Sequence, residues 1–157
     1  MASFADVESE EPDFARRVRA AFDAHRHKIL ATLRADGSPR VSGIEASFSE
    51  GELWLAGMTR SVKFADLRRD PRMALHSGSD EPDSFTADAK VSGRAVEVTG
   101  AERAAFAAAT NNEPDGDYDL FRVDLGQVVL TAVAEDKSAL VISSWRPGRG
   151  LTETRRT

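Results

Sequence analysis

The chain has 157 residues, of which 41% are apolar and 30% are charged, with a formal net charge of −5 and no cysteine. This length and balance predict one globular domain with a buried core and argue against disorder. The negative net charge disfavours a dedicated nucleic-acid binder. The missing cysteines exclude disulfides, thiolate catalysis and cysteine-ligated metal sites. Because we find no run of about 18 apolar residues and no secretion signal, we expect a cytoplasmic protein without membrane spans.

The N-terminal region divides into two predicted segments. The first eleven residues are acidic and show no capping signal, so we expect a flexible arm over residues 1–11 and a single domain over residues 12–157. Pro12 suits the first turn of a helix. Apolar residues then recur at helical spacing, which predicts an amphipathic helix through about Arg26. These apolar residues are Phe14, Val18, Ala21 and Phe22.

The remainder of the chain is dominated by strand patterns. Turn signatures at Asp36-Gly37 and Glu50-Gly51 separate three alternating segments and predict a meander. A short helix follows from about Ser61 and ends before Pro71, because the residue before proline avoids the helical region. Seven or so strands, two or three helices and no βαβ alternation predict a mainly β (α+β) antiparallel barrel. The predicted strands lie near 28–34, 40–48, 52–56, 73–77, 89–99, 120–134 and 140–145, with a further helix near 102–109.

The most informative feature is the start of the short helix. Arg60 and Lys63 lie where the helix dipole disfavours positive charge, and a bound anion would remove that conflict. A phosphate held by free amides, with Ser61 and the two cations around it, fits the chemistry of a helix N-terminus. The alternative is a pair of solvated cations on an exposed helix.

The later cations of this helix have a simpler interpretation. Arg68, Arg69 and Arg72 lie close in sequence to Asp66 and Asp70. We expect them to form surface ion pairs with these two carboxylates rather than to contact a ligand.

An ordered set of short segments resembles the pyridoxamine 5'-phosphate oxidase-like superfamily of split β-barrel flavoproteins. The resemblance is strongest over residues 28–79 and implies a homodimeric barrel. It also implies FMN, or in actinobacterial branches the deazaflavin F420, bound at the subunit interface. The segments are Ala31-Thr32-Leu33, Asp36-Gly37-Ser38-Pro39-Arg40-Val41-Ser42, Ser61-Val62-Lys63 and Leu67-Arg68-Arg69-Asp70-Pro71-Arg72.

The resemblance implies three groups of cofactor-binding residues. Lys63 matches the family's phosphate-contacting lysine, and Thr59, Arg60 and Ser61 surround it at the end of the preceding strand. A tryptophan and an arginine near the C-terminus, Trp145 and Arg149, are similar to the segment that reaches the partner's cofactor, although a packing aromatic and a loop cation are the alternative. The segment expected along the flavin ring consists of Pro39, Arg40, Val41 and Ser42.

The resemblance predicts an FMN-dependent oxidoreductase that transfers hydride to or from an unknown small organic substrate. An F420-dependent reductase is the close alternative, and a non-catalytic flavin- or haem-binding protein is another. His76 is expected to have a packing role in the barrel wall, and it is also the one weak candidate for the axial ligand of a haem. Trp54 is expected in the core or the dimer interface. The tail over residues 151–157 has no histidine, unlike true pyridoxamine phosphate oxidases, which argues against vitamin B6 oxidation. We find no catalytic acid–base pair and predict no metal site.

Overall fold

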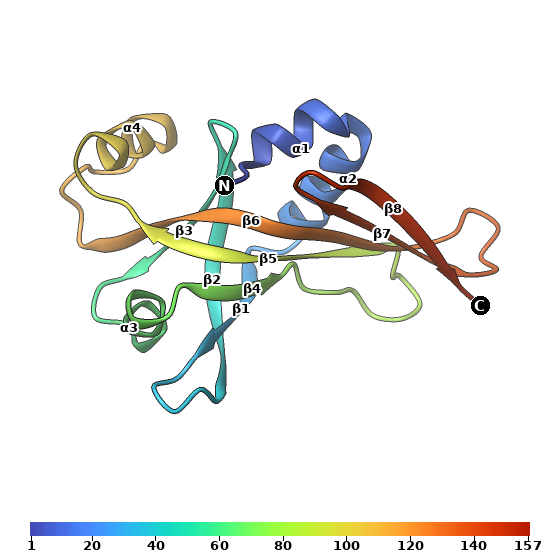
Figure 1. Cartoon of the computed structure of the whole chain (residues 1–157), viewed down its shortest axis with the longest axis horizontal. Coiled ribbons are helices and arrows are strands. Elements are labelled where there is room, and N and C mark those ends of the chain that lie inside the picture. The colour runs from blue at the N-terminus through green and yellow to red at the C-terminus, as the bar shows by residue number, and fades with distance from the viewer.

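The computed structural model describes all 157 residues and shows a barrel of antiparallel strands that is extended by a C-terminal hairpin (Figure 1). This confirms the predicted mainly β barrel. No helix is long and apolar enough to cross a membrane. The strands are β1 (His27–Leu33), β2 (Pro39–Ser49), β3 (Glu52–Met58), β4 (Arg72–His76), β5 (Ala87–Glu97), β6 (Tyr118–Val133), β7 (Leu140–Arg146) and β8 (Gly150–Arg156). The helices are α1 (Phe4–Glu10), α2 (Pro12–Asp23), α3 (Val62–Arg69) and α4 (Gly100–Thr110).

Six strands close the barrel in the order β3-β2-β1-β4-β5-β6, because β6 also pairs with β3. A bulge between Ser92 and Gly93 interrupts the long β5–β6 ladder. At this point the two backbones approach so closely that a Cβ on Gly93 would lie 2.0 Å from the carbonyl oxygen of Asp124. Only glycine therefore fits there. Beyond the barrel, β7 pairs with residues 128–133 at the C-terminal end of β6, and β8 pairs with β7.

The N-terminal segment is a capped helix that packs on the barrel. Ser3 and Asp6 form a reciprocal capping box at the start of α1, and Phe4 and Val7 are buried in the main core. The expectation of an uncapped arm over residues 1–11 is corrected by this helix. The physical reason is that Ser3 and Asp6 satisfy the first backbone amides while the two apolar side chains leave water.

Helices α3 and α4 each bury apolar side chains against the barrel. The apolar face of α3 buries Phe64 and Leu67, and Phe64 stacks on Phe121 of β6 with ring centroids 5.1 Å apart. On the outer surface of β3, Phe106 of α4 covers Trp54 at a centroid distance of 5.0 Å. Trp54 is therefore a core residue. Its position under α4 excludes it from the surface that could meet a second subunit.

Candidate functional site

The connection from β3 to α3 leaves backbone donors free. Ser61 stands at the N-cap position, but its hydroxyl donates to the carbonyl oxygen of Met58 at 2.5 Å and does not cap the helix. The amides of Val62 and Lys63 consequently have no acceptor within the chain. Arg60, just before the cap, adopts the left-handed conformation with φ of 63°, which is uncommon for a residue with a side chain. Free amides at a helix start form a ready site for an anion.

The cations at this helix start also lack acidic partners, and Lys63 has only the face of the Phe64 ring, with the ring centroid 5.6 Å from its Nζ atom. Neither Arg60 nor Lys63 forms an ion pair, while Arg68, Arg69 and Arg72 all do. The Lys63 stem passes Gly57, where an added Cβ would lie 3.9 Å from its Cε atom. Two uncompensated positive charges next to free amides create a local positive potential that favours an anion.

The ion pairs of the later cations agree in part with the sequence-based expectation. Arg69 pairs with Asp66 at 2.9 Å and Arg72 with Asp70 at 2.7 Å, as predicted. The predicted partner for Arg68 is wrong, because Arg68 pairs with Glu97 of β5 and with Asp119 of β6. These two carboxylates lie at the end of β5 and the start of β6, and the fold brings the last turn of α3 next to them.

The segment expected along a flavin ring lies on a strand edge that is partly free. Every residue from Pro39 to Glu45 pairs with β1, but β3 joins the other edge of β2 only from Glu45 onward. Alternate residues of a strand direct their N–H and C=O groups to the same edge. The free edge of β2 therefore offers backbone donors and acceptors to a ligand. Pro39, Arg40, Val41 and Ser42 lie on this stretch of β2; every other residue there directs its backbone groups to the free edge, and Pro39 has no N–H to donate.

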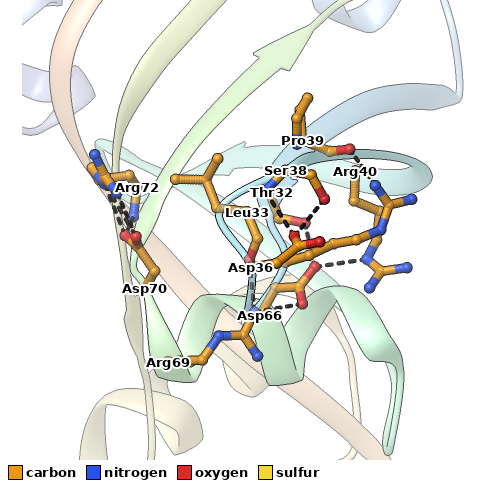
Figure 2. Close-up of polar contacts among 11 residues, drawn as sticks. Thr32, Leu33, Asp36, Ser38, Pro39, Arg40, Asp66, Arg69, Asp70 and Arg72 are labelled. Carbon is orange, nitrogen blue, oxygen red and sulfur yellow. Dashed lines mark hydrogen bonds and ion pairs between the residues drawn. The ribbon is translucent and has the colours of Figure 1, made fainter.

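A buried carboxylate links this strand to α3. Asp66, 2% exposed, accepts hydrogen bonds from the Thr32 hydroxyl and the Arg40 Nε atom at 2.7 Å each, and from Arg69 at 2.9 Å (Figure 2). Burial by itself would raise the pKa of Asp66, but the hydrogen bonds from Arg40, Thr32 and Arg69 outweigh it and lower the pKa to about 2. Asp66 and Lys63 are three apart on the helix, so Arg40 approaches the turn that carries Lys63.

Another carboxylate borders the helix start. Asp117, in the loop before β6, accepts a hydrogen bond of 2.9 Å from the Thr59 hydroxyl. Sequence reasoning did not assign Asp117 or Thr32 to the site, and it described Asp66 as a surface partner. The burial of Asp66 could have been predicted from its position between Phe64 and Leu67, the apolar residues that define the buried face of α3.

The predicted C-terminal residues lie apart from these groups within one chain. Trp145 is fully buried, and its Nε1 atom donates to Glu10 of α1 at 2.8 Å, which agrees with the packing alternative. Arg149 is exposed in the β7–β8 turn and lines a polar pocket of about 160 Å³ with Ser144 and Arg146. Figure 1 shows this turn next to α1 and α2, well separated from α3. The fold thus groups Thr59, Arg60, Ser61 and Lys63 at the start of α3 and joins Arg40 to the same helix through Asp66, but it does not bring Trp145 or Arg149 to them.

The candidate haem ligand is already engaged on both ring nitrogens. The Nδ1 atom of His76 accepts the Gly78 amide at 3.0 Å, and its Nε2 atom lies 3.5 Å from Asp88. An axial bond to iron would have to displace one of these contacts. No three histidine, cysteine or acidic side chains group closely enough to hold a metal ion.

Comparison with known proteins identifies this architecture. The family model described as Pyridoxamine 5'-phosphate oxidase matches residues 14–132. None of the curated proteins is significantly similar to the chain.

Three solved structures share the fold. A pyridoxamine 5'-phosphate oxidase-related, FMN binding protein from Nostoc punctiforme PCC 73102 is 14% identical, with a TM-score of 0.63 over 96% of this chain and 97% of that one. A heme binding protein from Mycobacterium smegmatis is 17% identical, with a TM-score of 0.60 over 99% and 88%. An F420 reductase is 20% identical, with a TM-score of 0.53 over 70% and 94%. Because the family model spans most of the barrel and these structures share its topology, the chain belongs to the pyridoxamine 5'-phosphate oxidase-like superfamily of split β-barrel proteins.

Proposed function

We propose that the chain is a cytoplasmic, homodimeric oxidoreductase that binds FMN and transfers hydride to or from a small organic substrate. The observation that carries this proposal is the helix start, where the unpaired cations Arg60 and Lys63 lie beside the free amides of Val62 and Lys63. That donor set matches a phosphate monoester, which carries two charges and accepts several hydrogen bonds. The family membership makes a flavin phosphate the expected ligand.

Different residues would bind the phosphate and the ring of such a cofactor. Lys63, Arg60 and the two amides would hold the phosphate, and Arg40 would approach it from β2. Backbone groups on the free edge of β2 would orient the ring. When bound, FMN supplies reversible hydride transfer at its ring, while the protein orients the ring and adjusts its electronics.

F420 is the alternative cofactor. Its tail carries a phosphodiester, which has one negative charge where the monoester of FMN has up to two, and the F420 reductase shares this fold. The absorbance spectrum distinguishes the two chromophores, with a maximum at about 450 nm for the flavin and about 420 nm for the deazaflavin. Haem is less well supported, because both ring nitrogens of His76 have partners.

The test is to identify the cofactor and then remove one charge. Mass spectrometry of the cofactor extracted from purified protein distinguishes FMN, F420 and haem. In titrations, Lys63→Ala should weaken binding about ten- to a hundredfold, because one charge-assisted phosphate contact is lost. Arg16→Ala, which removes an exposed charge on α2, is the matched control and should bind normally. Equal affinities of Lys63→Ala and wild type would refute the phosphate assignment.

The dimer is proposed from an apolar strip on the outer face of the barrel next to the free edge of β2. Val41 is 69% exposed and Ile29 is 45% exposed. Ala31, which pairs with Val41, and Ala74, which pairs with Ala31 on its other side, add apolar surface to this face. We infer that a second copy covers this strip and brings its own Arg149 toward the cofactor, since one chain keeps Arg149 away from Lys63.

Assembly is tested by charging the strip. Ile29→Glu should shift the protein from dimer to monomer in light scattering at micromolar concentration and lower cofactor affinity with it. Leu140→Glu, which charges a similarly exposed apolar residue on β7, should remain a dimer. A wild-type monomer that binds the cofactor tightly would contradict the shared site.

A further inference from the structure

The buried carboxylate of Asp66 holds two arginines in different ways. Arg69 donates from one terminal nitrogen both to Asp66 and to the Leu33 carbonyl oxygen at 2.7 Å, so it ties α3 to β1. Arg40 is bound through its Nε atom alone. Its two terminal nitrogens have no acceptor in the chain, and its side chain remains 25% exposed. Figure 2 shows the two arginines meeting Asp66 from opposite sides.

This geometry leaves the terminal edge of the Arg40 guanidinium available. A guanidinium has donors on all three nitrogens, and its two terminal nitrogens together form a fork that matches an oxyanion. The Asp66 carboxylate accepts a hydrogen bond from the Nε atom of Arg40 and so restricts rotation of the guanidinium. The Thr32 hydroxyl donates to the same carboxylate oxygen and helps to fix its position. A long side chain fixed in this way loses less entropy when it binds an anion.

We propose that Asp66 is a positioning residue, which raises affinity for the phosphate of the bound cofactor by fixing Arg40. The inference rests on the proposed cofactor site. Asp66 then raises the affinity for an anion although it is negatively charged, whereas its charge alone would lower that affinity.

The sign of one mutational effect separates these two roles. Asp66→Asn removes a negative charge near the phosphate site. If Asp66 acted only through its charge, affinity for FMN would rise, because a nearby repulsion is lost. If Asp66 positions Arg40, affinity falls, because the amide holds the guanidinium less firmly. Asp70→Asn is the control, since it removes the same charge from an exposed pair with Arg72.

The experiment titrates FMN and riboflavin, its phosphate-free parent, into five proteins. These are wild type, Asp66→Asn, Arg40→Ala, the double variant and Asp70→Asn. We expect Asp66→Asn and Arg40→Ala each to lose about tenfold in FMN affinity, and the double variant to lose no more than Arg40→Ala. Riboflavin affinity should stay unchanged in all five, and Asp70→Asn should bind FMN normally. If the wild type binds F420 instead, the same panel uses F420 and its chromophore without the phosphate-bearing tail.

Several outcomes would overturn the inference. These are unchanged or tighter FMN binding by Asp66→Asn, equal losses for riboflavin and FMN, and losses that add in the double variant. In each case a wild type that binds FMN leaves the proposed function standing. A wild type that binds neither cofactor overturns both proposals. Should Asp66→Asn fail to fold, Thr32→Val removes the second donor to the same oxygen with little change of volume. It should lower FMN affinity a few-fold and leave riboflavin affinity unchanged, and unchanged FMN affinity would count against the proposal.

Discussion

Asp66→Asn also tests the electrostatics of the buried contact through stability in acid. The pKa of Asp66 is about 2 in the folded protein and 3.8 in the reference state. Each pKa unit corresponds to about 1.4 kcal/mol, so the ionised carboxylate stabilises the fold by about 2 kcal/mol at neutral pH. Because the folded pKa is the lower one, this stabilisation is present above pH 3.8 and is lost as the pH falls toward 2. By pH 3 about 1 kcal/mol of it is gone.

The assay is urea unfolding of wild type and Asp66→Asn, followed by tryptophan fluorescence between pH 7 and pH 3. The wild type should be the more stable protein at pH 7, and the difference between the two unfolding free energies should shrink by about 1 kcal/mol at pH 3. Other carboxylates titrate in both proteins and cancel in the difference. Gly43→Ala, which adds a methyl group in open space and changes no titratable side chain, should keep a constant difference from wild type. A difference between wild type and Asp66→Asn that does not change with pH would refute the reasoning.

Two further predictions concern packing. Gly93→Ala should lower the unfolding free energy by about 3 kcal/mol or more, because its Cβ would collide with the Asp124 carbonyl. Gly43→Ala, with open space around it, is the control. Equal stability of the two variants would contradict the close approach of the backbones at Gly93. Trp145→Phe should cost about 1–2 kcal/mol in thermal or urea unfolding, since it leaves Glu10 without its indole donor. In Glu10→Ala protein the same substitution should cost clearly less, and equal costs would show that the hydrogen bond contributes nothing.

The sequence by itself determined the class of fold and the principal candidate for phosphate binding. Alternating strands, the Asp36-Gly37 turn and the Pro71 stop depend on local backbone preferences, and these remain readable without tertiary contacts. The same holds for the conflict between Lys63 and the helix dipole, which involves residues one turn apart. The helix at 4–10 was missed although its capping box is local, because a short acidic segment outweighed the Ser3 and Asp6 pattern.

Only the tertiary structure decided the ion pairs between residues that lie far apart in the sequence and the burial of the charged groups. Arg68 pairs with Glu97 and Asp119 because the fold brings the last turn of α3 next to the end of β5 and the start of β6, at sequence separations that no local pattern encodes. The sequence likewise does not distinguish the buried Asp66 of α3 from Asp70, because Thr32 and Arg40 reach Asp66 from β1 and β2. Because burial removes water from a carboxylate, its protonation state depends on the hydrogen bonds that its protein partners donate. The candidate site therefore depends on how the barrel closes as much as on the residues that line it.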